Sequence, residues 1–352
     1  MEPVTHFLTG ACMGRSWFNR KTAFATVTMT LAAEAPDLDM VGYFKNSTFG
    51  FAHHRGFTHS FLGLVPMSLL VVAVVYLCWH LRGRKIKNPD RPPRWGLLLL
   101  FAYIAGVGHI LLDYTNNYGV RPFWPFSERW YSWDIIFIVE PALLILLIGG
   151  LVLPSLFSLI NEEIGARAKG PKGRWAATVA LIGMVAVWSV RGYEHRKAVN
   201  ALEARMYRNE YPVRASAYPY WWNPFHWYGV VETENFFVTM QINSATPEVD
   251  PQDQMRIYYK PPETPATLAA KRSYLGRVYL DWAQYPLVEP QILADSGYLV
   301  TFQDLRYAYP DRAGNALRAS ARLAPDLHVL REGFGRGSPD RSRQDQSRPG
   351  TQ

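Results

Sequence analysis

The first half of the chain carries four long apolar runs, and they constrain its fold more than any other feature. The runs cover residues 61–81, 95–112, 135–160 and 175–190. An α-helix rises about 1.5 Å per residue, so about 20 apolar residues cross the roughly 30 Å hydrocarbon core of a bilayer. One such run can be a buried core helix of a soluble protein. Four in succession predict an integral membrane protein.

A short helical hairpin is expected before these runs. Helices are predicted at residues 4–14 and 22–35, joined by the turn "RSWFNRK". Each is short for a full crossing, which favours a re-entrant or thinly spanning pair. The expected fold over residues 1–190 is therefore an α-helical polytopic membrane domain of about six helical segments, made of four clear spans plus this N-terminal hairpin.

The second half of the chain has a different composition. Several of its segments alternate apolar and polar residues and are rich in β-branched and aromatic types, as strands are. The spacing of apolar residues in 266–286 predicts a helix. We expect a small α+β or mostly β extramembrane domain over residues 191–334, followed by a low-complexity, disordered tail at 335–352. The aromatic segment 217–229 fits either a membrane-interface belt or the core of this domain.

The net charge of +8 has an uneven distribution that predicts orientation. The loops 82–94 and 161–174 and the hairpin turn together carry thirteen Lys and Arg, whereas the loops 37–60 and 114–134 carry four. Basic loops stay in the cytoplasm. The C-terminal domain is therefore expected on the periplasmic face of a bacterial inner membrane. Because topology explains the charge, no nucleic-acid partner is predicted.

Ionisable residues gather on the side of the predicted bundle that faces this domain, where five of the nine histidines lie. The residues are His6, Asp37, Asp39, His53, His54, Arg55, His59, His109, Asp113 and Asp134. His109 and Asp113 are four apart and share one helix face. Imidazole and carboxylate groups are ligands of zinc, manganese or iron. The convergence predicts a site for one or two divalent ions, with zinc favoured.

Several of these residues also fit simpler roles. His6 can cap the first helix, and Arg55 can contact either a lipid headgroup or a phosphate oxyanion. Asp113 can pair with Arg121. Glu140 fits either a buried hydrogen-bonded acid or a group that orients a ligand histidine.

The ordered motifs "TH", "PDLD", "HHRGFTHS" and "GHILLDYTNNYG", with "PFS" soon after, resemble a known family. This is the family of bacterial inner-membrane proteins described as LexA-binding, membrane-bound metal-dependent hydrolases, typified by YdjM. The resemblance covers roughly residues 1–145, with departures at Ala35 and Glu140 that leave the site intact. It implies a metal set of His6, Asp37, Asp39, His54, His59, His109 and Asp113, with Arg55 and Asp134 close by.

The expected function is that of a membrane-bound metal-dependent hydrolase. Its substrate would be a phosphoester or lipid-linked molecule of the outer leaflet, so membrane lipid is the expected partner. The metal would activate a water molecule. Asp37 or Asp39 would bridge metals or act as a base, Arg55 would hold the phosphoryl group, and Asp134 completes the expected catalytic set.

Two other functions stay open at this stage. One is a metal-binding or metal-transporting membrane protein without covalent chemistry, because intramembrane His and Asp residues also line ion pathways. The other is haem ligation, which the accompanying carboxylates disfavour. The sequence has no P-loop and no GxSxG motif, so nucleotide use and serine hydrolysis have no support.

Overall fold

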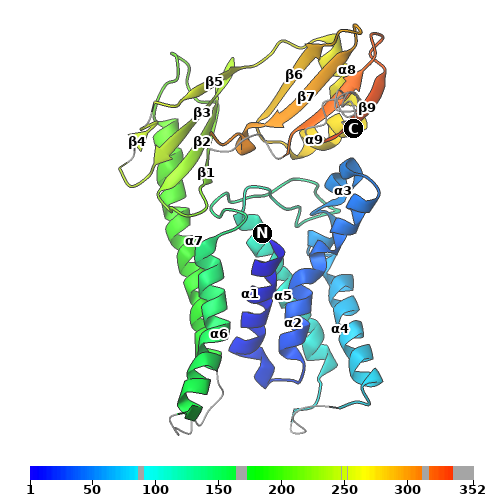
Figure 1. The fold of residues 1–352 in the computed structure, drawn as a ribbon, viewed down its shortest axis with the longest axis vertical. Helices are drawn as coiled ribbons and strands as arrows, with labels where there is room; N and C mark the ends of the chain where they lie inside the picture. Colours follow the sequence, from blue (N-terminus) through cyan, green and yellow to red (C-terminus); the bar gives the residue numbers. More distant parts are fainter. Residues whose placement is uncertain (86–90, 164–172, 247, 252, 311–316, 336–352) are drawn as a thin grey trace, which may run out of the picture.

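The computed structural model places a bundle of helices beneath two β-sheets, and the chain reaches the sheets only after it has completed the bundle (Figure 1). The structure describes residues 1–85, 91–163, 173–246, 248–251, 253–310 and 317–335. The predicted disordered tail lies, apart from Gly335, outside the described residues.

Six of the helices before the sheets form the bundle. They are α1 (Pro3–Ser16), α2 (Ala25–Glu34), α4 (Leu64–Leu81), α5 (Trp95–Thr115), α6 (Pro141–Glu163) and α7 (Arg174–Glu203). Three of them, α4, α5 and α7, are long and apolar enough to cross a membrane, and the described apolar part of α6, Pro141–Phe157, is shorter. The helical, membrane-type N-terminal region is confirmed. Three candidate spans do not confirm the predicted four, nor that all six helices are membrane segments, so that count stays a prediction.

The predicted N-terminal hairpin is formed by α1 and α2, which pack very closely. A Cβ at Gly10 would lie 2.6 Å from the Met29 carbonyl oxygen, and one at Gly14 would lie 2.5 Å from Thr26 Cα. Small residues four apart let two helix backbones approach in this way. The crossing fixes α1 against α2 and brings the start of α1 next to the end of α5.

The predicted loop 37–60 is wound into short helices. After α2 come the 3₁₀ helix η2 (Ala35–Phe44), α3 (Ser47–His53) and the 3₁₀ turn η3 (Phe57–His59). Pro36 has no N–H to continue the α-helical ladder, which explains the change of helix type after Glu34. The short helices give this segment a fixed backbone, so its side chains have defined directions.

The C-terminal region is rich in β-sheet, as the sequence predicts. The first sheet contains β1 (Arg214–Pro219), β2 (His226–Glu232), β3 (Phe236–Asn243), β4 (Glu248–Val249) and β5 (Arg256–Tyr259), and the second contains β6 (Pro286–Ile292), β7 (Tyr298–Asp304), β8 (Ala319–Leu323) and β9 (Val329–Phe334). Every pairing is antiparallel. The 3₁₀ turn η4 (Leu305–Tyr307) follows β7.

Two helices, α8 (Pro265–Arg272) and α9 (Tyr274–Trp282), connect the sheets where the sequence predicts one helix. The single-helix prediction for 266–286 is wrong because Ser273 has an extended backbone and caps α9 by accepting a hydrogen bond from Gly276 N. Ser273 N also donates to the Ala270 carbonyl oxygen at the end of α8, so both helix ends at the break have a hydrogen-bond partner.

Helix α7 joins the two halves of the protein. It runs without interruption across the predicted domain boundary at residues 190 and 191 and ends against the first sheet (Figure 1), where Ala198 and Leu202 enter a core with Trp227. Part of the aromatic segment 217–229 has the predicted core role, and the membrane-interface role of the rest stays a prediction. Trp227 and Tyr228 are buried, whereas Trp221 and Trp222 are exposed.

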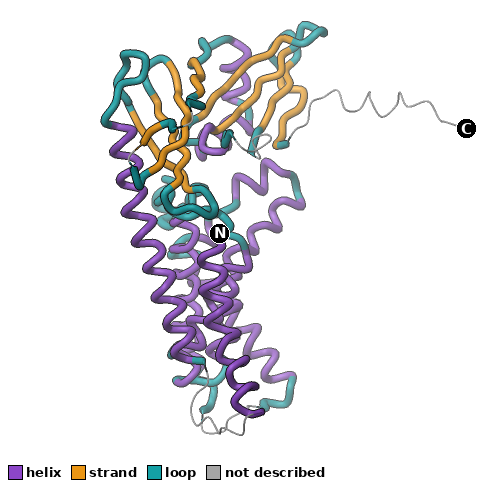
Figure 2. The backbone as a smooth tube through the Cα atoms, turned by 60° about the vertical axis from the view of Figure 1, so that its left-hand side comes forward, coloured by secondary structure: helices purple, strands orange, loops and turns teal. Residues whose placement is uncertain are grey.

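Helix α9 of the C-terminal region packs against α3 and against the segment that follows α5. Phe51 of α3 and Tyr118, which follows α5, share one hydrophobic core with Leu275, Tyr279 and Trp282 of α9. The sheets therefore lie over the end of the bundle that carries α3 and the segments on either side of it (Figure 2). This is the end at which the predicted ionisable residues gather.

Candidate metal centre

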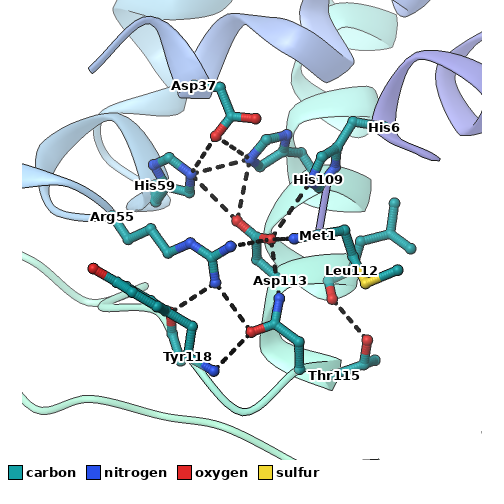
Figure 3. A network of polar contacts seen from close by, with 12 residues as sticks. Met1, His6, Asp37, Arg55, His59, His109, Leu112, Asp113, Thr115 and Tyr118 are labelled. Carbon is teal, nitrogen blue, oxygen red and sulfur yellow. Dashed lines mark hydrogen bonds and ion pairs between the residues drawn. The ribbon is translucent and has the colours of Figure 1, made fainter. Parts of the chain in front are cut away.

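Four side chains from three separate segments of the bundle converge on one point (Figure 3). Asp37 comes from η2, His59 from η3, and His109 and Asp113 from successive turns of α5. One ligand atom of each lies within 4.8 Å of those of the others. His59, His109 and Asp113 are buried, and the Asp37 side chain is 17% exposed, so Asp37 marks the open side of the cluster.

The spacing of these atoms matches a tetrahedral metal site. Bonds of about 2.0–2.1 Å from zinc to nitrogen and oxygen give a tetrahedron whose corners are about 3.3–3.4 Å apart. The two Nε2 atoms of His59 and His109 are 3.0 Å apart. From these nitrogens, Asp113 Oδ2 lies at 3.3 and 3.4 Å and Asp37 Oδ1 at 3.4 and 3.7 Å. Five of the six corner-to-corner distances are therefore close to the ideal value.

Hydrogen bonds at Nδ1 leave both histidines free to bind through Nε2. The His109 Nδ1 lies 2.6 Å from the Ala33 carbonyl oxygen. The His59 Nδ1 lies 3.2 Å from Asp39 Oδ2 and 3.0 Å from Thr58 Oγ1, whose own hydrogen goes to Asp39. These oxygens accept here, so each Nδ1 carries a hydrogen, and each Nε2 is the nitrogen that lies among the other ligand atoms. Metal-binding histidines in proteins are held by carboxylates and carbonyls in this manner.

The two oxygens of Asp113 have different surroundings. Oδ1 accepts from Arg55 Nη2 at 2.8 Å, lies 3.4 Å from His6 Nε2 and contacts the Met1 amino group. Oδ2 is buried and makes no hydrogen bond among the described residues. A buried carboxylate oxygen without a donor is costly, and a bound cation would satisfy it. The alternative pairing with Arg121 is not observed, because Arg121 donates to the Ala52 carbonyl oxygen.

The other predicted ligands surround this cluster. His6 stacks on His109 with ring centroids 3.7 Å apart. Asp39 accepts from Thr58 Oγ1 at 3.0 Å, from Arg55 N at 2.9 Å and is 2.9 Å from His54 Nδ1. His6 therefore supports the ring of His109, and Asp39, which His54 contacts, supports the ring of His59.

Arg55 connects the cluster to the segment after α5. Its Nη1 donates to Asn116 Oδ1 at 3.2 Å and to the Gly119 carbonyl oxygen at 3.1 Å, and its guanidinium carbon lies 4.7 Å from the Tyr118 ring centroid. The backbone of Arg55 has φ +56°, a left-handed conformation that is unfavourable for a bulky residue. The surrounding contacts offset this cost and hold the guanidinium against Asp113.

The electrostatics of the cluster favour a cation at its centre. Burial disfavours a charge on His59, but the carboxylates of Asp113, Asp37 and Asp39 outweigh it and raise the pKa of His59 to about 10. Burial alone would raise the pKa values of Asp37 and Asp39, but contacts with the neighbouring histidines hold both well below the usual range of a carboxyl group. The site is therefore a concentration of negative charge that a divalent ion can neutralise.

Asp134 is not brought into this cluster. It lies half-buried in the segment after α5, near Ser132 and the Arg306–Asp304 pair of the C-terminal region, and its buried Oδ1 makes no hydrogen bond among the described residues. Burial raises the pKa of Asp134 to about 6. Its backbone has φ +59°, in the left-handed region that Asn and Asp tolerate best.

Replacing Asp134 with asparagine is expected to stabilise the protein above pH 6 and to have little effect at pH 4. A raised pKa means that the folded state holds the proton more tightly, so this contribution is complete below the unfolded-state pKa of about 4 and is lost as pH rises through about 6. Asparagine removes that loss, worth up to about 3 kcal/mol. Thermal unfolding in detergent at pH 4 and pH 8 measures it.

The control is Asp253→Asn, because Asp253 is an exposed aspartate with φ +51°. This variant measures how much stability asparagine gains from the left-handed backbone alone, at a position where the side chain is not buried. An equal gain for Asp134→Asn at both pH values would assign the effect to the backbone and contradict the role of charge.

Several site residues lack a distinctive sequence signal. Asn116, Tyr118 and Gly119 all contact Arg55, and Thr58 donates to Asp39. The motif "TNNYG" directly after a span marks the segment as unusual, but it does not indicate which residue it contacts. The contact between this segment and Arg55 becomes visible only in the folded structure, from the path of the backbone after α5.

The apolar helices and the buried His–Asp cluster define an integral membrane protein with a candidate metal centre at one end of its bundle. The chain belongs to the YdjM inner membrane protein family, whose model matches residues 1–198. The family resemblance expected from the motifs is thus confirmed, and with it the membrane location.

The matched region contains every predicted ligand and stops short of the sheets. The chain is also similar to the uncharacterized protein YfhP of Bacillus subtilis (strain 168), with 30% identity over 153 residues. That match covers 41% of this chain and 43% of YfhP, less than half of either protein. No solved structure matches the chain at a significant level.

Proposed function

We propose that the protein is a membrane-bound metal-dependent hydrolase that cleaves a phosphoester, such as a lipid-linked one, at the periplasmic surface of the inner membrane. In this proposal α6 is the fourth span, and the basic loops lie in the cytoplasm. The observation that supports it best is the near-tetrahedral set formed by Asp37, His59, His109 and Asp113. Two imidazoles and two carboxylates suit zinc, and also manganese or iron.

The roles of the chain's own residues follow from the contacts. His59, His109, Asp113 and Asp37 would hold the ion, while Asp39 and the Ala33 carbonyl fix the two imidazole rings. A bound divalent ion supplies Lewis acidity and lowers the pKa of a coordinated water molecule. Asp37 is ionised at neutral pH because its pKa is depressed, which suits a metal ligand, and its partial exposure places it at the side from which a substrate would approach.

The surface beside Asp37 favours a substrate with a lipid part. Around Asp37 and Asp39, helix η2 exposes Leu38, Met40, Val41 and Phe44, the last with 91% of its surface accessible. Large apolar side chains exposed together on one short helix are typical of a membrane-interaction surface. A phosphoester headgroup at the membrane surface would therefore approach the ligands next to an apolar face.

The position of the cluster favours an enzyme over a transporter. His109 and Asp113 lie in the C-terminal part of α5, and the other ligands lie in η2 and η3, beyond the bundle helices. Transporters generally place their ion sites near the middle of the bilayer. A site at the end of the helices instead faces the headgroup region, where a lipid-linked phosphoester is found.

The test is metal-dependent release of the phosphate-containing headgroup from phospholipid vesicles, followed by mass spectrometry, with bis(p-nitrophenyl) phosphate as a soluble probe. We expect turnover by zinc- or manganese-loaded protein, loss of turnover with a chelator, and a decrease of at least about 100-fold in Asp113→Asn. The decrease is expected because asparagine cannot supply the charged Oδ2.

The control variant is His53→Ala. His53 adjoins the site in sequence, but its Nδ1 contacts the Phe49 carbonyl oxygen and its ring stacks on Phe49. It should retain full turnover. If metal-loaded wild type cleaves neither the phospholipids nor the soluble probe, the hydrolase proposal fails and the protein is better described as a metal-binding membrane protein.

A further inference from the structure

The segment Asn116–Gly119 lies between the metal cluster and the C-terminal region. On one side, three of its residues contact Arg55: Asn116 through its side-chain oxygen, Gly119 through its carbonyl and Tyr118 through its ring. Asn116 Nδ2 also lies 3.4 Å from Asp113 Oδ1. The position of Arg55 against Asp113 therefore depends on the path of these four residues (Figure 3).

On the other side, the C-terminal region binds the carbonyl groups that this segment leaves free. Arg306 Nη1 donates to the Asn117 carbonyl oxygen at 2.8 Å, and the Tyr307 hydroxyl donates to the same oxygen at 3.1 Å. The indole N–H of Trp282 donates to the Tyr118 carbonyl oxygen at 3.0 Å. Three side chains from α9 and η4 thus hold two consecutive peptide groups of the segment.

The donors themselves are rigid. Arg306 is 1% exposed, and its remaining nitrogens are bound by Asp304 Oδ2 at 2.8 Å and by the Trp282 carbonyl oxygen at 3.0 Å. The rings of Trp282 and Tyr307 stack with centroids 5.5 Å apart. A buried guanidinium is stable only when its hydrogen bonds are satisfied. The Asn117 carbonyl is one of those acceptors, so the segment and Arg306 fix each other.

We propose that the C-terminal domain positions the metal centre through Trp282, Arg306 and Tyr307. These side chains hold the Asn116–Gly119 segment, the segment holds Arg55 on Asp113 Oδ1, and Asp113 Oδ2 is left directed at the two histidines. The family model ends at residue 198, before all three donors. The C-terminal domain therefore lies outside the matched region, whereas all the ligands that it positions lie inside that region.

This inference rests on the proposed metal centre and is tested with cobalt(II), whose visible absorption reports the geometry of its ligands. The test variant is Trp282→Phe/Tyr307→Phe, which removes two donors to the segment and retains Arg306. We expect cobalt affinity to fall by about 10- to 100-fold, as it does when residues that orient metal ligands are lost, and the absorption bands to shift.

The matched control is Trp227→Phe/Tyr309→Phe. Trp227 is fully buried and donates to Ser244 Oγ, and the Tyr309 hydroxyl donates to the Pro219 carbonyl oxygen. The control therefore removes one indole N–H and one phenol hydroxyl from the same domain, as the test variant does, but neither of them donates to the Asn116–Gly119 segment. It should keep the wild-type cobalt affinity and spectrum. If the double test variant does not fold, Trp282→Phe and Tyr307→Phe are measured singly, each with a smaller change in the same direction.

The outcomes separate this inference from the proposed function. A folded test variant with wild-type cobalt affinity and spectrum overturns the positioning role, whatever the hydrolase activity. Wild type that binds cobalt but cleaves no phosphoester overturns the hydrolase proposal, while the difference between test and control variants still supports positioning. Wild type that binds no cobalt overturns both.

Discussion

His59→Ala and His109→Ala are each expected to eliminate stoichiometric binding of divalent metal, with a loss of affinity of at least about 100-fold. Each variant removes one of four ligand atoms whose mutual distances match a tetrahedral site. The remaining imidazole and two carboxylates would hold an ion only weakly at neutral pH. Elemental analysis of detergent-purified protein, given as metal per chain, measures the effect.

The control for both variants is His53→Ala. His53 lies six residues before His59, and its ring contacts Phe49 through both its hydrogen bond and its stacking. It should keep the wild-type metal content. Folding is checked by size-exclusion chromatography, because His59→Ala leaves Asp37, Asp39 and Asp113 with less compensating charge. Well-folded wild-type protein without stoichiometric metal would contradict the metal centre itself.

The pair His109 and Asp113 shows which part of the site the sequence can predict. Four-residue spacing at the end of an apolar run predicts that both lie on one face of a helix. In α5 they do, with His109 Nε2 3.4 Å from Asp113 Oδ2. The motif "HHRGFTH" likewise indicates a site, but not which histidine supplies the ligand. His53, His54 and His59 differ in role because α3 and η3 direct their side chains differently, and short helices of this kind have no strong sequence signal.

Contacts across long sequence separations could not be predicted. Arg55 was expected to hold a phosphoryl group, but its guanidinium is occupied by Asp113, Asn116 and Gly119, so direct contact with a substrate stays a prediction. Trp282 and Arg306 reach the segment after α5 from more than 160 residues away. Such contacts depend on how the second sheet packs on the bundle, and periodicity within one segment carries no information about that packing.

The prediction with the largest expected effect on stability concerns Glu140, for which the sequence left two roles open. In the structure it does not touch a ligand histidine. Arg191 Nη2 donates to both of its carboxylate oxygens at 2.8 Å, and Arg191 Nη1 donates to the Tyr220 carbonyl oxygen at 3.1 Å. Both side chains are buried. The pair links the start of α6 to α7 and to the segment between β1 and β2.

Glu140→Ala is therefore expected to destabilise the protein by about 3–5 kcal/mol, because it leaves the Arg191 guanidinium buried without a counter-charge. Glu140→Ala/Arg191→Met should recover most of this loss, since removing both charges also removes the need to solvate either one. Glu263→Ala breaks an exposed pair with Lys271 and should have a much smaller effect, because solvent screens that pair. Denaturant unfolding of the three variants in one detergent compares them. Equal losses for Glu140→Ala and the double variant would show that the cost comes from packing at the α6–α7 junction rather than from an uncompensated charge.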